Sequence, residues 1–208
     1  MRRAITRLGA IFSLCLSLCS PASFAAAGHT HAHADDSELP PGAYSTASLY
    51  QLESTWITAT EQRIPLGALR GKVRLVVMHY TTCEYACPIL ISIVQNIEKA
   101  LAPEILAQVG FVAVTFDPER DTSAVLKAYS DKMHLEARRW TLLSGQPDDV
   151  LELAVLLGVK YKKDAQGGFA HSNLITVLNK EGEIVYRHIG LYHPVADTLA
   201  AITKAAQE

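Results

Sequence analysis

The chain has 208 residues, of which 49% are hydrophobic and 19% are charged. Its 19 Lys and Arg residues are balanced by 21 Asp and Glu residues, and a chain without a basic excess is not expected to bind nucleic acid. The length suits one domain with a hydrophobic core of its own, and the sequence contains no internal repeat.

The first 27 residues have the pattern of a secretory signal peptide. Three arginines precede an apolar run at 8–19, and small residues follow it as far as Ala27. This order predicts cleavage after Ala25 or Ala27. The apolar run is shorter than the roughly 20 residues that a membrane-spanning helix needs. We therefore expect residues 1–27 to be removed and the protein to be exported, to the periplasm or an equivalent compartment, without membrane attachment.

Removal of this segment changes the cysteine and charge balance. Cys15 and Cys19 would be lost, which leaves Cys83 and Cys87. The remaining chain has 16 Lys and Arg residues against 21 Asp and Glu residues, a formal charge of −5. In an oxidising compartment, two cysteines so close in the sequence form a disulfide, a redox pair or a metal site.

Residues 28–45 are small, polar and proline-bearing, and they show no apolar periodicity. We expect a flexible tail there, followed by one folded domain at 46–208. Within the tail, His29, His31 and His33 could gather Cu(II) or other divalent ions near the new N-terminus. A solvated tail with no specific role explains these histidines equally well.

Beyond the tail, segments with strand-like and helix-like patterns alternate. Strands are predicted around Trp56 within 50–60, and at 73–78, 111–116, 140–143, 174–178 and 184–188. Helices are predicted after Pro88, at 124–133, from about Pro147 and after Pro194. Alternating strands and helices make parallel strand pairs, whereas the last two strands are joined by a short turn and make a hairpin. This order predicts an α/β protein with a thioredoxin-like fold, in which helices flank a central mixed sheet.

Cys83 and Cys87 lie at the turn between a predicted buried strand and the helix after Pro88. The redox pair of a thioredoxin is Cys-x-x-Cys, but three residues intervene here. Whether the segment is helical or a loop that enters the helix, the two sulfurs can converge on one ion. The helix N-terminus should also make the thiols ionise more readily. A plain disulfide, a redox pair and a metal site stay open at this point, because the choice depends on a third ligand.

Among the eight histidines of the chain, His171 is the best candidate for that ligand. It precedes the hairpin strand that, in a thioredoxin layout, lies beside the cysteine turn. The other histidines outside the tail have structural interpretations: His79 packs within a strand, His134 lies on a helix surface, and His188 and His193 flank the last strand.

Three separated motifs resemble the Sco/SenC family of copper-binding assembly proteins. They are Cys83-x-x-x-Cys87-Pro88, the segment 117–122 with the sequence Asp-Pro-Glu-Arg-Asp-Thr, and His171-Ser172. The resemblance covers roughly 49–201. It implies a thioredoxin fold whose two cysteines and His171 hold one copper ion, and a role in supplying the binuclear copper centre of cytochrome c oxidase. Many family members begin with a membrane anchor, and the predicted signal peptide departs from that pattern.

The donor atoms agree with this implication. Thiolates favour Cu(I) and imidazole suits either copper state, although zinc also accepts two sulfurs and one nitrogen. The expected partners are the copper-accepting subunit of a respiratory oxidase or another copper carrier, and a thiol-disulfide reductant, because copper binding needs reduced thiols. Asp117 and Asp121 belong to the resembling motif, but we expect them to cap a helix rather than to bind copper.

Two functions follow from these residues. A copper chaperone would use all three ligands, whereas a thiol-disulfide oxidoreductase would use Cys83 and Cys87 as a redox pair that keeps a partner's cysteines reduced. Thioredoxin-type reductases carry a cis-proline before the hairpin strand, but no proline lies between Pro147 and Pro194. The sequence therefore favours the chaperone. A peroxidase of the peroxiredoxin type is a third alternative.

Overall fold

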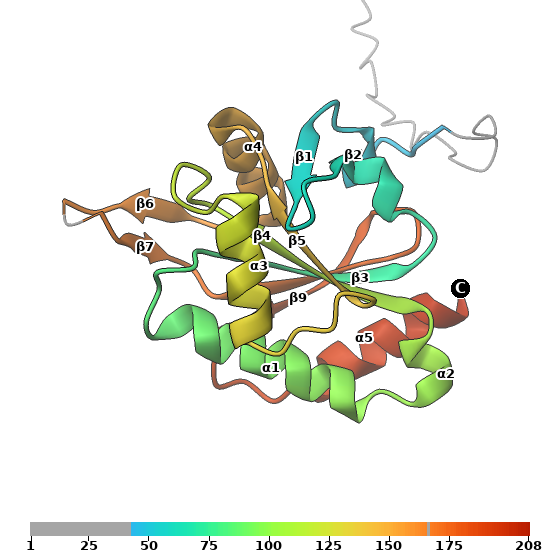
Figure 1. The fold of residues 1–208 in the computed structure, drawn as a ribbon. Helices are drawn as coiled ribbons and strands as arrows, with labels where there is room; N and C mark the ends of the chain where they lie inside the picture. Colours follow the sequence, from blue (N-terminus) through green and yellow to red (C-terminus); the bar gives the residue numbers. More distant parts are fainter. Residues whose placement is uncertain (1–42, 166) are drawn as a thin grey trace, which may run out of the picture. The chain divides into compact units, whose positions relative to one another are not determined.

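The computed structural model describes residues 43–165 and 167–208 (Figure 1). The predicted signal peptide, its cleavage site and the three histidines of the tail lie outside the described residues. Among the residues that are described, no helix is long and apolar enough to cross a membrane.

A seven-stranded mixed sheet forms the centre of the fold, with the strand order β2-β1-β5-β4-β3-β8-β9. Strands β3, β4 and β5 are parallel to one another, and β8 pairs antiparallel with both β3 and β9. The strands are β1 (Thr55–Thr58), β2 (Arg63–Pro65), β3 (Val73–His79), β4 (Val109–Thr115), β5 (Trp140–Ser144), β8 (Leu174–Leu178) and β9 (Ile184–Ile189). Parallel strands followed by a terminal hairpin confirm the predicted thioredoxin-like α/β class.

Helices cover both faces of this sheet. Figure 1 shows α1, α3 and α5 on one side and α4 on the other, and the buried side chains form one apolar cluster on each side. The helices are α1 (Ala86–Ala100), α2 (Pro103–Leu106), α3 (Ser123–Lys132), α4 (Pro147–Leu157) and α5 (Ala196–Gln207), and short 3-10 turns are η2 (Leu49–Gln51) and η3 (Leu66–Leu69). All seven residues of β4 are buried, as expected for a central strand with helices on both faces.

Helix α1 follows the predicted periodicity. Leu90, Ile91, Val94 and Ile97 recur at helical spacing on one face and are all fully buried. This stripe fixes the helix against the sheet. The helix begins at Ala86, slightly earlier than predicted. The cysteine turn therefore lies between the carboxyl end of the interior strand β3 and the first turn of this anchored helix.

Several local features differ from the sequence predictions. The strand expected within 50–60 is limited to 55–58. A second, two-stranded sheet of β6 (Tyr161–Lys163) and β7 (Phe169–His171) was not predicted, because its strands are short and partly exposed. His134 is exposed in a turn after α3, with a positive φ of 54°, rather than on the helix surface.

Two residues before position 46, Tyr44 and Ser45, also contact the folded domain. Ser45 is buried and its hydroxyl donates to the carboxylate of Glu183. The ring of Tyr44 packs edge-on against that of Tyr50, and Arg70 lies over it. The last residues of the predicted tail therefore pack on the domain, because an aromatic ring among polar residues finds an apolar partner there.

His79, at the end of β3, is fully buried. Its ring stacks on that of Tyr129 with centroids 4.9 Å apart, as its structural interpretation predicts. Neither ring nitrogen hydrogen-bonds to another described residue. Burial, reinforced by the charge of His171, lowers the pKa of His79 to about 4. The imidazole is therefore neutral in the folded protein at neutral pH.

We predict that His79→Phe stabilises the domain by about 1–2 kcal/mol at pH 7, because it removes a buried polar ring whose hydrogen bonds are not satisfied within the protein. The difference in unfolding free energy between the variant and the wild type should increase as the pH falls. In the unfolded chain the histidine pKa is about 6.5, so protonation favours unfolding as the pH falls from 6.5 towards 4. Between pH 7 and pH 4.5 the wild type should lose roughly 2 kcal/mol more than the variant.

Urea denaturation of both proteins at several pH values measures this difference. The variant serves as the reference for all other groups that titrate in this range. Equal losses of unfolding free energy in the two proteins would contradict the assigned role of His79.

Candidate metal centre

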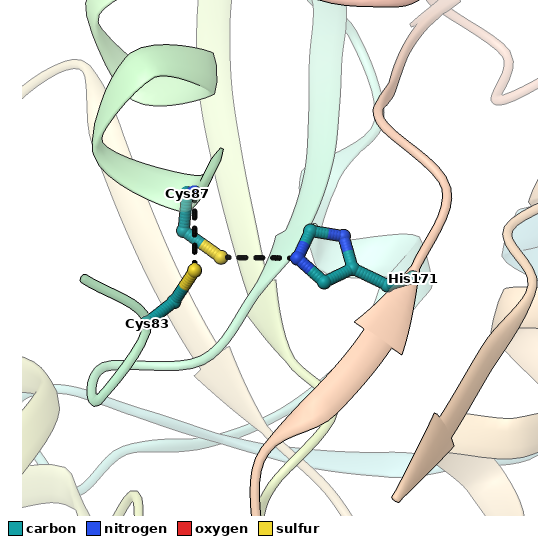
Figure 2. A group of neighbouring side chains, drawn as sticks. All are labelled: Cys83, Cys87 and His171. Atoms are coloured by element: carbon teal, nitrogen blue, oxygen red, sulfur yellow. Dashed lines mark hydrogen bonds between the residues drawn. The ribbon is translucent and has the colours of Figure 1, made fainter. Parts of the chain in front are cut away.

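The two cysteines occupy the passage from β3 into α1 (Figure 2). The backbone N–H of Cys83 donates to the carbonyl of Tyr80 in a turn. The backbone N–H of Cys87, in the first turn of α1, donates to Sγ of Cys83 at 3.3 Å. Tyr85, the residue at the N-cap position, provides no side-chain cap. The sulfur of Cys83 therefore accepts one of the hydrogen bonds that a helix N-terminus leaves unsatisfied.

His171 ends strand β7 and reaches the cysteines from the other side. Its Nε2 lies 3.6 Å from Sγ of Cys87, and its Nδ1 lies 3.2 Å from the carbonyl oxygen of Ser172. A tautomer that donates from Nδ1 to this carbonyl leaves the Nε2 lone pair directed at the sulfurs. The three ligand atoms all lie within 4.8 Å of one another. The structure thus brings together the three residues that the sequence singled out.

Aromatic side chains support the histidine ring. The ring centroid of His171 lies 5.1 Å from that of Phe116 and 6.0 Å from that of Tyr80. Phe169, two residues earlier on β7, packs against the same two rings at 5.1 Å each. Alternate residues of a strand share a face, so the apolar contacts of Phe169 place His171 on the side of β7 that faces the cysteines.

The two thiols differ in their tendency to ionise. Burial raises the pKa of Cys83, but hydrogen bonds from the backbone and side chain of Cys87, from His171 and from the backbone of Tyr85 outweigh it and lower the pKa to about 7. Cys87 is fully buried, and this burial raises its pKa. The sequence predicted that the helix N-terminus would make both thiols ionise more readily. This is confirmed for Cys83 but wrong for Cys87, because loss of solvent around the buried thiol raises its pKa by more than the helix N-terminus lowers it.

Asp117 and Asp121 do not cap a helix. The cap of α3 is Thr122, whose hydroxyl accepts from the backbone of Val125. Both aspartates are almost fully buried. The carboxylate of Asp121 accepts hydrogen bonds from Thr81 and Thr115, and that of Asp117 accepts from Arg120 in the same turn. The prediction failed because Thr122, the residue directly before the helix, caps it, which leaves the two carboxylates free to accept from side chains and backbone outside the helix.

The remaining histidines of the described part of the chain lie outside the cluster. His188 is buried and its Nδ1 lies 3.0 Å from the hydroxyl of Thr198, which agrees with a structural role. His134 and His193 are exposed. Sequence reasoning did not single out Thr81 and Arg120, which contact the two aspartates. The motif at 117–122 was the signal that could have drawn attention to Arg120.

Comparison with known proteins adds independent findings. The family model described as SCO1/SenC matches residues 44–207. A curated SCO2-like protein of Rickettsia typhi is 28% identical over 120 residues, which cover 56% of this chain and 59% of that protein. The chain thus spans about six-tenths of the length of this relative.

Solved structures share the fold. Arabidopsis thaliana ScoI with copper bound is 25% identical, with a TM-score of 0.62 over 74% of this chain and 97% of that chain. BsSco, described as a member of the Sco family of cytochrome c oxidase assembly proteins with a disulfide switch, is 23% identical. Its TM-score is 0.66, over 76% of this chain and 94% of that chain. The likeness to BsSco shows the fold alone.

We predict that Cys83 is the reactive thiol. At pH 7 the reduced Cys87→Ser variant, which retains Cys83, should react with iodoacetamide about tenfold or more faster than the Cys83→Ser variant, because the partly exposed Cys83 is easier to reach than the buried Cys87 and a larger fraction of it is ionised. Mass spectrometry over time measures the two rates, and the same proteins in urea, where both thiols are exposed, provide the control. Faster modification of Cys87 in the folded protein would refute this assignment.

Proposed function

Because the chain belongs to the SCO1/SenC family, we propose that it is a copper chaperone that binds one copper ion and delivers it to the binuclear copper centre of cytochrome c oxidase. The observation that carries the proposal is the convergence of Cys83, Cys87 and His171 within 4.8 Å. The copper bound to Arabidopsis ScoI and the assembly role ascribed to the Sco family of BsSco support the choice of metal and recipient.

The chemistry of the donor atoms suits a transported ion. Two thiolates and one imidazole form a soft, three-ligand set that favours Cu(I) and leaves one side of the ion open. Cys83 and His171 are only partly buried, whereas Cys87 is fully buried. A recipient can therefore approach the ion from the side of Cys83 and His171 and replace the ligands one at a time.

The site must operate with reduced thiols. Both cysteines are free in the structure, and a thiolate rather than a disulfide binds the metal.

We propose export to the periplasm, because residues 1–27 contain a basic, an apolar and a small-residue segment in the order of a signal peptide. In that oxidising compartment the protein needs a thiol-disulfide reductant as a partner.

A thiol-disulfide oxidoreductase is the second candidate. The observation in its favour is the difference between the thiols: Cys83 has a pKa of about 7 and is partly exposed, while Cys87 is buried with a raised pKa. An accessible attacking thiol beside a buried resolving thiol suits disulfide exchange. This reading gives His171 no direct part in the reaction.

We predict that the reduced domain binds one copper ion per chain and that Cys83→Ser and Cys87→Ser each abolish tight binding. His171→Ala should weaken Cu(I) binding by roughly 100-fold, since losing one of three donors removes several kcal/mol of binding energy. Competition with a Cu(I) chelator of known affinity measures these changes.

His193→Ala is the matched control for that titration, because His193 is exposed and lies outside the cluster. Its copper affinity should equal that of the wild type. Wild-type affinity in His171→Ala would exclude three-ligand coordination and leave only a dithiol.

A cellular experiment separates the two candidate functions. In a strain that lacks the protein, we expect His171→Ala to fail to restore copper content and activity of the oxidase, while the purified variant still exchanges disulfides through its two cysteines. The reason is that the imidazole binds the ion, whereas the covalent steps of disulfide exchange use only the two sulfurs. Full restoration by His171→Ala would favour the oxidoreductase.

A further inference from the structure

The segment 117–122 carries a sequence motif but supplies no ligand to the cluster, and its contacts show another role. We propose that Arg120 is a positioning residue for His171: its guanidinium ties the β6–β7 hairpin to the loop that also holds the cysteine turn. This inference rests on the proposed function, because its purpose is to hold the third copper ligand at a fixed distance from the two sulfurs.

One end of the loop holds the cysteine turn. The carboxylate of Asp121, fully buried, accepts a hydrogen bond from the backbone N–H of Thr81 at 3.0 Å and another from the Thr81 hydroxyl. It also accepts from the hydroxyl of Thr115, at the end of β4. Thr81 lies two residues before Cys83, so Asp121 fixes the start of the segment that carries the first sulfur.

The same loop holds the histidine hairpin through Arg120. Its Nε donates to the carboxylate of Asp117, which is only 2% exposed. Another guanidinium nitrogen donates to the carbonyl oxygen of Gly167 in the β6–β7 turn. The guanidinium carbon also lies 5.9 Å from the ring centroid of Phe169. A planar guanidinium can make these contacts at once, and a buried carboxylate keeps it oriented.

The hairpin lies outside the main sheet and is held by aromatic packing and a few polar contacts. An isolated two-stranded sheet is marginally stable in water, and within the described residues β6 and β7 pair only with each other. The ion pair between Lys163 and Glu119 is exposed on both sides and is expected to contribute little. The backbone N–H of Phe169 also donates to the hydroxyl of Tyr80, at 3.4 Å. Besides this bond and the aromatic contacts, Arg120 provides a charged link that joins the hairpin of His171 to the loop 117–122.

The contact of Asp121 with the cysteine turn and the contact of Arg120 with the β6–β7 hairpin are joined by a short, continuous stretch of backbone. The backbone N–H of Asp121 donates to the carbonyl of Asp117 at 2.9 Å, and that of Arg120 donates to the same carbonyl at 3.1 Å. The two buried carboxylates thus belong to one tight turn. A displacement of this turn would change the distance between Sγ of Cys87 and Nε2 of His171, which is 3.6 Å.

The test is a double-mutant cycle on the full mature chain with Arg120→Gln, His171→Ala and their combination. Arg120→Gln should weaken Cu(I) binding about 10- to 100-fold, the range found for residues that orient a metal ligand. In the His171→Ala background it should change the affinity little, because the ligand that it positions is gone. Additive losses, or an unchanged affinity in Arg120→Gln, would overturn the proposal.

A metal-free measurement accompanies the titration. The His171 ring lies beside Phe116, so its proton chemical shifts report its position. Arg120→Gln should shift these signals and leave those of the buried His188 unchanged. Arg138→Gln removes an exposed guanidinium elsewhere and should leave both the copper affinity and the His171 signals as in the wild type. Unmoved His171 signals in Arg120→Gln would count against the proposal.

Loss of Arg120 leaves Asp117 buried without its cation, which can destabilise the fold. The double variant Asp117→Asn, Arg120→Gln removes the charge and the guanidinium together and should show the same copper phenotype with an intact fold. Wild-type copper binding in it would refute the positioning role. If His171→Ala alone binds copper like the wild type, the proposed three-ligand function fails, and this inference fails with it.

Discussion

The hydrogen bond from the backbone N–H of Cys87 to the sulfur of Cys83 is the constraint on which the centre depends. It makes the first sulfur the cap of α1, so both sulfurs are fixed by the same helix end that the apolar stripe of α1 anchors to the sheet. A spacing of three intervening residues suits this arrangement, because the first cysteine can turn back from the loop onto the amide of the second. The bond also contributes to the difference between the pKa values of the two thiols. It stabilises the thiolate of Cys83 and lowers its pKa, whereas burial raises the pKa of Cys87.

The rest of the fold supplies the third donor. A thioredoxin-like sheet alone places a cysteine turn at the end of a central strand, but here the chain between α4 and β8 forms the extra β6–β7 hairpin. Aromatic packing around Phe116 directs its last residue, His171, towards the sulfurs. The third donor therefore comes from a separate two-stranded hairpin, while the seven-stranded sheet supplies only the turn with the two thiols.

The sequence predicts those parts of the molecule whose signals are local. The apolar runs of β3 and β4, the stripe of α1 and the Cys-x-x-x-Cys spacing each follow from neighbouring residues. His171 was indicated by its position before the hairpin strand and by the family resemblance. The hairpin that carries His171 could not be predicted, because three-residue strands such as 161–163 have too little alternation to be distinguished from a loop. The raised pKa of Cys87 and the partners of Asp121 arise from contacts made only in the folded chain, which no spacing in the sequence reveals.

Unequal burial of the three ligands has a consequence for copper transfer under the proposed function. An incoming thiolate must approach the ion before any bond breaks, and the partly exposed Cys83 and His171 border the accessible side. Under that function these two ligands would be displaced first, and the fully buried Cys87 would retain the ion until the recipient has supplied its own donors. Because burial disfavours an uncompensated thiolate at Cys87, departure of the cation favours uptake of a proton by this sulfur. The proton stabilises the empty site and opposes return of the ion, so the burial that raises the pKa of Cys87 also gives the transfer its direction.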